Sequence, residues 1–94
     1  MADIGFLNPM RRTVTVLSKE GCHLCDEVIE ALGSLSSLHD FEVKVLDIQE
    51  DTKLHDEYCH RIPVVRINGK DIFDARDMAR TAGYMQSLER LVKS

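Results

Sequence analysis

Two cysteines three positions apart, Cys22 and Cys25, are the feature that most limits what this chain can fold into. Before them, residues 13–18 form a β-branched run of nearly continuous apolar character, which predicts a central strand covered on both faces. After them, apolar side chains recur at helical spacing, at Leu24, Val28, Ala31, Leu32, Leu35 and Leu38. The sequence therefore predicts a Cys-x-x-Cys pair at a strand-to-helix junction, a place typical of thiol redox sites.

The position of the pair favours Cys22 as the more reactive thiol. Residues three apart on a helix lie on the same face, so the two sulfurs can close a small disulfide ring. A helix start presents unpaired backbone N–H groups and the positive end of the helix dipole, and both stabilise a thiolate. The dipole contributes only about 0.3–1 kcal/mol at an exposed site. We therefore expect the Cys22 thiolate to be stabilised further by hydrogen bonds from backbone N–H groups and from the Cys25 thiol. Lys19 would contribute as a nearby cation.

The composition is that of one globular domain. The chain has 94 residues, of which 44% are hydrophobic and 30% are charged, so a folded core is expected. The formal net charge of −4 argues against nucleic acid as the main partner. No apolar run approaches the roughly 18 residues that a membrane-spanning helix needs, so no membrane partner is expected.

The cysteine count and the first residues indicate the compartment. Three cysteines is an odd and small number for a secreted disulfide scaffold. The first residues lack the basic end and the apolar block of a secretory signal. We therefore expect a reducing, cytoplasmic compartment, where a cysteine pair is catalytic or metal-binding. Residues 1–12 are expected to form a flexible lead-in, and residues 13–94 the domain.

The middle of the chain predicts a second strand and a short helix. Residues 41–47 alternate apolar and charged side chains, which is typical of a strand. Because a helix separates it from the first strand, the two strands should run parallel. Asp51 is expected to cap a helix over residues 52–58, with Leu54 and Tyr58 as its buried face.

The last third predicts a hairpin and one long helix. The run over residues 61–67 is expected to form a strand with Pro63 at its head. Asn68-Gly69 is a strong signal for a tight hairpin that leads into residues 70–73. Asp74 is expected to cap the final helix, with Asp77 three positions later in an acidic variant of the capping box. That helix would carry Gly83 at a cost of about 1 kcal/mol and would bury a stripe formed by Met78, Ala82, Met85, Leu88 and Val92. The predicted element order is βαβαββα.

Three segments resemble the glutaredoxin branch of the thioredoxin-like fold. Residues 18–25 (Ser-Lys-Glu-Gly-Cys-His-Leu-Cys) resemble the glutaredoxin active-site loop, including the lysine three positions before the first cysteine. Ile62-Pro63-Val64 resembles the segment that carries a cis-proline facing the cysteines, and Asn68-Gly69 resembles the hairpin that follows. The amino-acid sequences of residues 21–26 and 61–64 most resemble the corresponding segments of short glutaredoxin-like domains. The resemblance implies an α/β, thioredoxin-like fold with a four-stranded mixed sheet flanked by helices.

The resemblance also implies a thiol–disulfide oxidoreductase. Cys22, as thiolate, would attack a substrate disulfide, and Cys25 would resolve the mixed disulfide. Lys19, Ile62 and Pro63 would contact the substrate. The implied partners are a disulfide-containing protein or small-molecule disulfide and a reducing thiol or reductase. The protein is expected to act as a monomer and to require no metal or organic cofactor.

Two positions differ from the glutaredoxin pattern. His23 stands where glutaredoxins place a proline between the cysteines, and Phe73-Asp74 stands where they carry a Gly-Gly pair close to glutathione. Asp77 is the residue that remains as a contact to the glutathione amine. We therefore expect glutathione to be one candidate for the thiol reductant, but not a required one.

Several of these residues have a second interpretation. The four ligands of a zinc site could come from Cys22, Cys25, Cys59 and His60, although the last two are adjacent and not spaced like a zinc knuckle. Cys59 is either a small buried hydrophobic residue or a third redox thiol. His23 is either a solvated side chain or a modulator of the Cys22 thiolate. The alternative function is a thioredoxin-like binding module whose cysteines hold a metal or iron–sulfur cluster or are redox-inactive.

Overall fold

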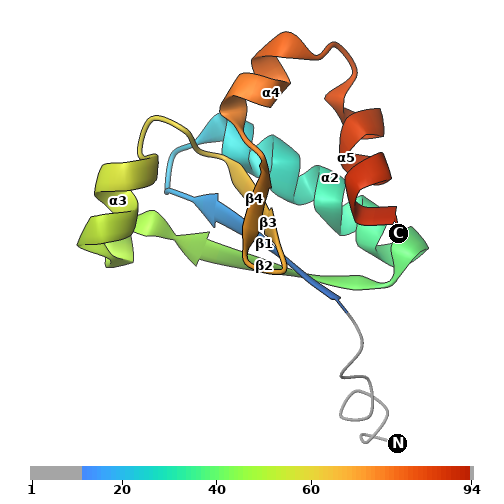
Figure 1. Cartoon of the computed structure of the whole chain (residues 1–94), viewed down its shortest axis with the longest axis horizontal. Coiled ribbons are helices and arrows are strands. Elements are labelled where there is room, and N and C mark those ends of the chain that lie inside the picture. The colour runs from blue at the N-terminus through green and yellow to red at the C-terminus, as the bar shows by residue number, and fades with distance from the viewer. Residues whose placement is uncertain (1–11, 94) are drawn as a thin grey trace, which may run out of the picture.

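Strand β1 (Arg12–Ser18) is an inner strand of the sheet, and the cysteine motif follows its end. The computed structural model describes residues 12–93 of the chain (Figure 1). The lead-in predicted for residues 1–12 therefore lies outside the described residues, except that Arg12 already belongs to β1.

The sheet has the mixed architecture that the sequence predicts. Strands β2 (Phe41–Asp47), β3 (Val64–Ile67) and β4 (Lys70–Phe73) join β1 in the order β2-β1-β3-β4. β1 pairs with β2 in parallel and with β3 in antiparallel orientation, and β3 and β4 form an antiparallel hairpin. The prediction of a four-stranded mixed sheet flanked by helices is confirmed for residues 12–93.

Side chains alternate across β1 and build a core on each face of the sheet. Val14 and Val16 belong to the larger core, under helices α2 (His23–His39) and α5 (Tyr84–Lys93). Leu17 points to the opposite face, where helix α3 (Thr52–Tyr58) covers a smaller core. That smaller core contains Leu17, Ile48, Tyr58 and Val64. The cysteine motif thus follows a strand that is packed on both sides, as predicted.

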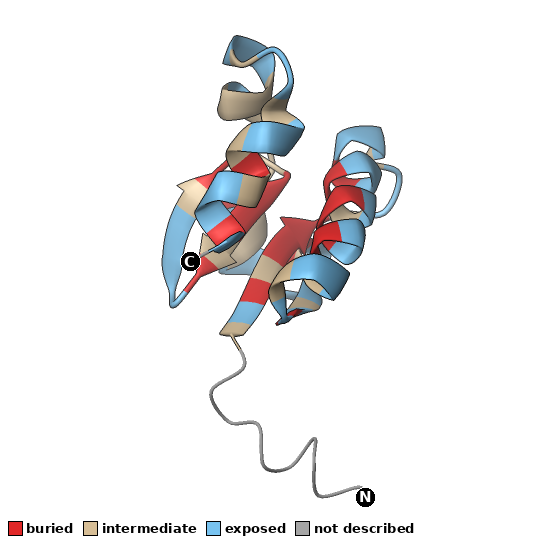
Figure 2. Cartoon of the chain, turned by 90° about the vertical axis from the view of Figure 1, so that its right-hand side faces the viewer, coloured by how far each residue is buried: buried red, intermediate tan, exposed pale blue. Residues whose placement is uncertain are grey.

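Helix α2 buries the centre of its predicted apolar stripe. Its fully or almost fully covered apolar residues are Cys25, Val28, Ala31, Leu32 and Leu35. Figure 2 shows these buried positions along the side of the helix that faces the sheet. The two ends of the stripe stay outside the core, since Leu24 is 45% and Leu38 71% exposed. The first and last turns of α2 leave these two side chains uncovered by the other described elements.

Short-range turn signals are confirmed. Asp51 caps α3 by accepting hydrogen bonds from the N–H groups of Lys53 and Leu54 at 2.9 and 3.3 Å. Asn68 and Gly69 have φ of 54° and 78°, the left-handed pair that a tight two-residue hairpin requires. A 3₁₀ turn, η1 (Ile48–Glu50), links β2 to α3 and was not predicted.

The long final helix is predicted wrongly. The chain forms α4 (Ala75–Arg80) and α5, separated by residues 81–83, so the element order ends in two helices. Gly83 has φ of +71°, a left-handed conformation that glycine adopts readily and that no helix interior contains. Leu88 and Val92 are buried as predicted, but Ala82 is exposed and Met85 is 42% exposed. Among residues 12–93, no helix combines the length and apolar character that crossing a membrane requires.

Candidate functional site

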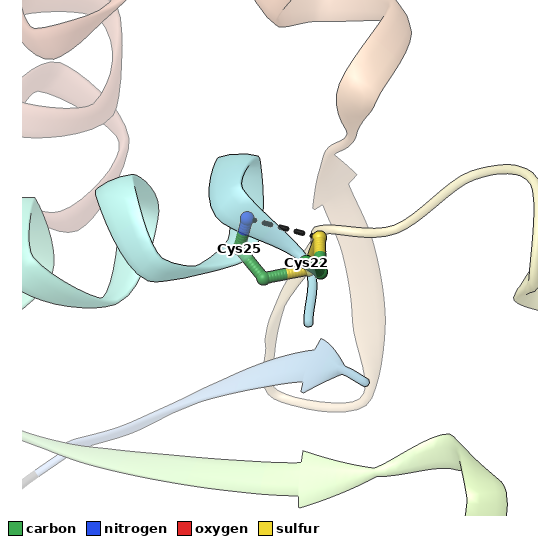
Figure 3. The surroundings of a disulfide bond; sticks show 2 residues. All are labelled: Cys22 and Cys25. Atoms are coloured by element: carbon green, nitrogen blue, oxygen red, sulfur yellow. Dashed lines mark hydrogen bonds between the residues drawn. A yellow bond between two sulfur atoms is a disulfide. The ribbon is translucent and has the colours of Figure 1, made fainter. Parts of the chain in front are cut away.

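The cysteine motif forms a tight turn between β1 and α2. Gly21 has φ of +85°, which glycine tolerates because it lacks a Cβ atom. The Cys22 N–H donates a hydrogen bond to the Lys19 carbonyl at 3.2 Å, and Cys22 then becomes the N-cap residue of α2. The Cα atoms of Cys22 and Cys25 are 5.2 Å apart, and their sulfurs are joined in a disulfide (Figure 3). The spacing in the sequence predicted this pairing.

The two cysteines differ in exposure and in contacts. Cys22 is partly exposed, whereas the Cys25 side chain is completely buried. The backbone N–H of Cys25 donates a hydrogen bond to the Cys22 Sγ atom at 3.1 Å (Figure 3). Such a donor stabilises negative charge on sulfur, and it acts on Cys22. The geometry therefore suits Cys22 for attack on an incoming disulfide and Cys25 for a second, internal step.

The segment over residues 59–63, which joins α3 to β3, lies beside the cysteine motif. The Ile62–Pro63 peptide bond is cis, as the resemblance implied. Leu17 pairs with Val64 in the register of β1 and β3, so Pro63 lies next to the end of β1, where the motif begins. Figures 1 and 3 both show this segment passing close to the start of α2. The structure thus brings Ile62 and Pro63 near the two cysteines.

Lys19 lies on a different flank of the motif. It lines a shallow surface pocket between the start of α2 and the end of β2, together with the carboxylates of Glu20, Asp26 and Asp47. The exposed side chain of Val45 forms part of the same pocket. This flank is therefore mixed in charge with an acidic excess, and Lys19 is its cation.

Asp77 takes part in the start of α4. Its Oδ2 atom accepts a hydrogen bond from the Asp74 N–H at 2.9 Å, and its Oδ1 atom accepts one from Arg80 at 3.3 Å. Asp74 and Asp77 form the capping box that the sequence predicted. A contact from Asp77 to a glutathione amine would have to compete with this cap. The sequence analysis did not take this competition into account.

His23 and Cys59 occupy different environments. His23 is exposed at the first position of α2, next to Cys22. Cys59 is a free, partly buried thiol that follows α3 and packs against the smaller core, which fits the interpretation as a small hydrophobic residue. Within residues 12–93, no three or more His, Cys, Asp or Glu side chains lie together in an arrangement that could hold a metal ion. The four zinc ligands considered from the sequence are therefore not assembled into one group.

A charged network around Tyr58 was missed by the sequence analysis. The Tyr58 hydroxyl donates a hydrogen bond to Asp71 at 2.7 Å and accepts one from Arg66 at 3.0 Å, and Arg66 also donates to Asp71 at 2.8 Å. The guanidinium groups of Arg61 and Arg66 lie 4.8 and 5.6 Å from the centre of the Tyr58 ring. The predicted Asn-Gly hairpin contained part of the signal, because it places residue 66 opposite residue 71. The contacts of Tyr58 depend on the docking of α3 and had no sequence signal.

The network lowers the pKa of Asp71. Burial by itself acts to raise this pKa, but hydrogen bonds from Arg66 and Tyr58 and the positive charges of Arg66 and Arg61 outweigh the burial. Donation of its proton to Asp71, with burial, raises the pKa of the Tyr58 hydroxyl. Burial likewise opposes ionisation of Asp74, yet hydrogen bonds from Arg76 hold its pKa below the ordinary value. Both carboxyls are therefore ionised at neutral pH.

These two carboxyls predict a loss of stability in acid. A pKa that is lower in the folded state contributes stability above the unfolded pKa, about 3.9 for aspartate, and this contribution is lost as the pH falls through the folded value. The Asp71→Asn variant should be about 1–2 kcal/mol less stable at pH 7 and should show a shallower dependence below pH ~4. Urea unfolding at pH 7, 5 and 3 measures both effects.

The Asp56→Asn variant is the matched control, because the Asp56 side chain is 78% exposed and lies outside the network. It should unfold at the same urea concentration as the wild type. Equal acid sensitivity in the wild type and the Asp71→Asn variant would contradict the role given to Asp71.

Comparison with known proteins places this arrangement in a family. A family model described as glutaredoxin-like domain (DUF836) matches residues 13–93. The solution NMR structure of protein Ne2328 from Nitrosomonas europaea is similar, with 33% sequence identity and a TM-score of 0.62 over 68% of this chain and 78% of that chain. This likeness supports a thioredoxin-like fold. No curated protein matches the chain.

Proposed function

The chain belongs to the glutaredoxin-like domain family, and from this premise we propose that it is a small thiol–disulfide oxidoreductase. A Cys-x-x-Cys pair that closes a disulfide fits the thiol redox role that the family description implies. The observation that carries the proposal is the asymmetry of the pair. Cys22 is the partly exposed residue, and its Sγ atom accepts a hydrogen bond from the Cys25 N–H, whereas the Cys25 side chain is completely buried.

In the first step, the Cys22 thiolate attacks one sulfur of a substrate disulfide. A new bond forms between Cys22 and that sulfur, and the other substrate sulfur leaves as a thiolate that takes a proton from water. The hydrogen bond from the Cys25 N–H stabilises the attacking thiolate. This step exchanges one disulfide for another and consumes no oxidant or reductant.

In the second step, Cys25 loses its proton and attacks the Cys22 sulfur of the mixed disulfide. The substrate leaves as a second thiol, and the Cys22–Cys25 disulfide forms. The substrate gains two electrons and two protons in total, and the protein loses them. A thiol reductant, of which glutathione is one candidate, then reduces the Cys22–Cys25 disulfide to the dithiol by the same kind of exchange and is itself oxidised to a disulfide.

The surroundings of the pair support a set of secondary proposals. Ile62 and Pro63 lie beside the cysteines and would hold an extended substrate, while Lys19 would stabilise anionic groups on the other flank. The substrate would be a protein or a small molecule that carries a disulfide. We place the protein, as a monomer without a bound cofactor, in the reducing cytoplasm.

An intact mass measured across a series of glutathione redox buffers tests the proposal. We expect the mass to decrease by two hydrogens at a defined potential, because the dithiol and disulfide forms differ by two protons and two electrons. The Cys59→Ser variant should show the same transition, since Cys59 is not part of the pair. The Cys25→Ser variant should not show it. A glutathione adduct on Cys22 would identify glutathione as a substrate or a reductant of the protein.

No mass change in the wild type over the whole series would contradict the proposal. The same transition in the Cys25→Ser variant would also contradict it, because another thiol would then be the partner of Cys22. In the first case the alternative of a binding module with inactive cysteines would replace the enzyme.

A further inference from the structure

The pocket that Lys19 lines, here called the α2–β2 pocket, lies where the ends of the parallel strands β1 and β2 approach the start of α2 (Figure 3). Its volume is about 480 Å³, within the range of roughly 300–1,000 Å³ that is typical of ligand sites. Gly21 belongs to its lining, and Cys22 follows Gly21 in the chain, with about 3.8 Å between consecutive Cα atoms. The α2–β2 pocket therefore adjoins the cysteine assigned to the attack on the substrate.

One part of the lining is apolar and consists of Ile29 and Val45. Side chains alternate along a strand, so Val45 lies on the same face of β2 as Val43, which packs against the larger core under α2. Val43 is partly buried, whereas Val45 is 49% exposed. β2 is an edge strand, and no other described strand lies beyond it. Apolar surface is therefore available for contact beside the cysteine motif.

A nearly buried hydroxyl group also belongs to the lining. Ser18 is 7% exposed, and alternation along β1 places it on the same face as Val16, under α2. Its register partner on β2 is Asp47, another lining residue. The Ser18 hydroxyl takes part in none of the side-chain hydrogen bonds within residues 12–93, and a buried hydroxyl without a partner is unfavourable. This hydroxyl remains for a ligand in the α2–β2 pocket.

The charged part of the lining has three carboxylates, Glu20, Asp26 and Asp47, and one ammonium group, that of Lys19. None of the ion pairs within residues 12–93 involves any of these four side chains. Asp47 Oδ1 accepts a hydrogen bond from the Gln49 N–H at 2.8 Å, which leaves its second oxygen for another donor. The carboxylates do not form one of the compact groups that hold a metal ion, none of which occurs in the described part of the chain. Their spread around the pocket suits an extended organic cation.

We propose that the α2–β2 pocket binds a lysine or arginine side chain of the protein whose disulfide Cys22 reduces. Such a side chain has an apolar stem, which fits Val45 and Ile29, and a cationic head, which fits the carboxylates. The head can also donate to the Ser18 hydroxyl, and hydrogen bonds that involve a charged group are stronger than neutral ones. The open edge of β2 leaves room for the extended segment that carries this side chain. This inference rests on the proposed function, and it names the class of partner for the same site.

Peptide disulfides that differ in one side chain test the α2–β2 pocket through the reaction itself. Symmetric disulfides of three short peptides are compared, with Arg, Gln or Glu two residues before the cysteine, and a second set moves this residue two positions further away. The value of kcat/KM for the Arg peptide should exceed that for the Gln peptide roughly three- to tenfold at low salt in at least one set, as expected for a few partly exposed ion pairs. The preference should shrink as salt is added, because salt screens exposed charges.

Three variants locate the preference in the α2–β2 pocket. Glu20→Gln/Asp26→Asn should lower the Arg-to-Gln ratio to about one or two, and the ratio cancels any change in the reactivity of Cys22 itself. Asp56→Asn/Glu57→Gln is the matched control, because it removes the same charges from exposed positions on α3, over the opposite face of the sheet, and should keep the ratio. Ser18→Ala should lower the ratio by about threefold or more. If the pocket double variant does not fold, Glu20→Gln alone replaces it, since Glu20 is exposed in the turn before α2.

Binding without any disulfide tests the same pocket independently of turnover. The Arg peptide with serine in place of its cysteine should shift the backbone amide signals of Gly21 and Val45 in NMR spectra of the isotope-labelled protein, and the Gln peptide should not. Spermidine is the probe for a free small cation. Shifts with spermidine but with neither peptide would overturn the assignment to a protein partner.

The two proposals fail in different ways. Equal kcat/KM values for the Arg, Gln and Glu peptides in both sets, in a protein that does reduce them, overturn the cation pocket and leave the enzyme. An equal fall of the ratio in the pocket variant and in the α3 control also overturns the pocket. No reduction of any peptide, with amide shifts that still depend on the Arg side chain, overturns the oxidoreductase and leaves the binding site.

Discussion

The Cys22→Ser variant is expected to lose disulfide reductase activity by at least about a thousandfold, because the hydroxyl that replaces the thiol does not ionise near neutral pH and forms no mixed disulfide. The sulfur that is lost belongs to the partly exposed residue of the pair and accepts a hydrogen bond from the Cys25 N–H. The rate of reduction of a small disulfide, followed with an excess of thiol reductant, measures the effect. Activity equal to that of the wild type would contradict the assignment of Cys22.

The Cys25→Ser variant separates the two steps. Without the buried thiol, the first exchange can still occur at Cys22, but the internal attack that releases the substrate is missing. We therefore expect a mixed disulfide between Cys22 and substrate to accumulate and to be visible by intact mass. Cys59→Ser is the matched control, since it also removes one thiol and should react like the wild type. A mixed disulfide on Cys59 in place of Cys22 would require a different mechanism.

The Leu32→Ala variant should have the largest effect on folding stability among simple truncations of α2. Leu32 is completely buried in the larger core, and a buried leucine reduced to alanine typically costs about 2–5 kcal/mol through lost burial and a cavity. Domains of this kind are stable by only about 5–15 kcal/mol in total. The midpoint of urea unfolding should therefore fall strongly, with little change in the slope of the transition.

Leu38→Ala makes the same chemical change on the same helix and serves as its control. The Leu38 side chain is 71% exposed, so the variant should stay within about 0.5 kcal/mol of the wild type. Equal loss in both variants would mean that helix propensity, and not burial, determines the result. Because α2 also begins with the cysteine pair, a destabilised Leu32→Ala protein should lose activity at a lower temperature than the wild type.

Local sequence signals were sufficient for most of the framework. The order of strands and helices up to residue 74, the cap at Asp51 and the turn at Asn68-Gly69 all depend on contacts within a few residues. The same is true of the cysteine pair, because a spacing of three at a helix start by itself brings the two sulfurs within reach. The final helix is the exception. There, the apolar stripe outweighed the glycine signal at Gly83, and the predicted helix ran through a real break.

The exposure of individual side chains was not predictable in the same way. Leu24 and Leu38 fit the apolar stripe of α2 as well as Leu32 does, yet both remain largely exposed, at 45% and 71%. Burial depends on where the neighbouring elements end, and helical periodicity contains no information on that point. Met85 was misassigned to the core for the same reason.

By itself, the sequence determined the mixed sheet, the cysteine pair at the start of α2 and the proline that lies beside it. Only the tertiary structure decided how the charges around Tyr58 are shared. The partners of Tyr58, Asp71 and Arg61 come from α3, β3, β4 and the start of α4, which meet only after the chain has folded. The strength of an ion pair depends on distances between side chains far apart in the chain, whereas a turn or a cap depends on a few consecutive backbone angles. The charged network around Tyr58 therefore became visible only in the folded protein.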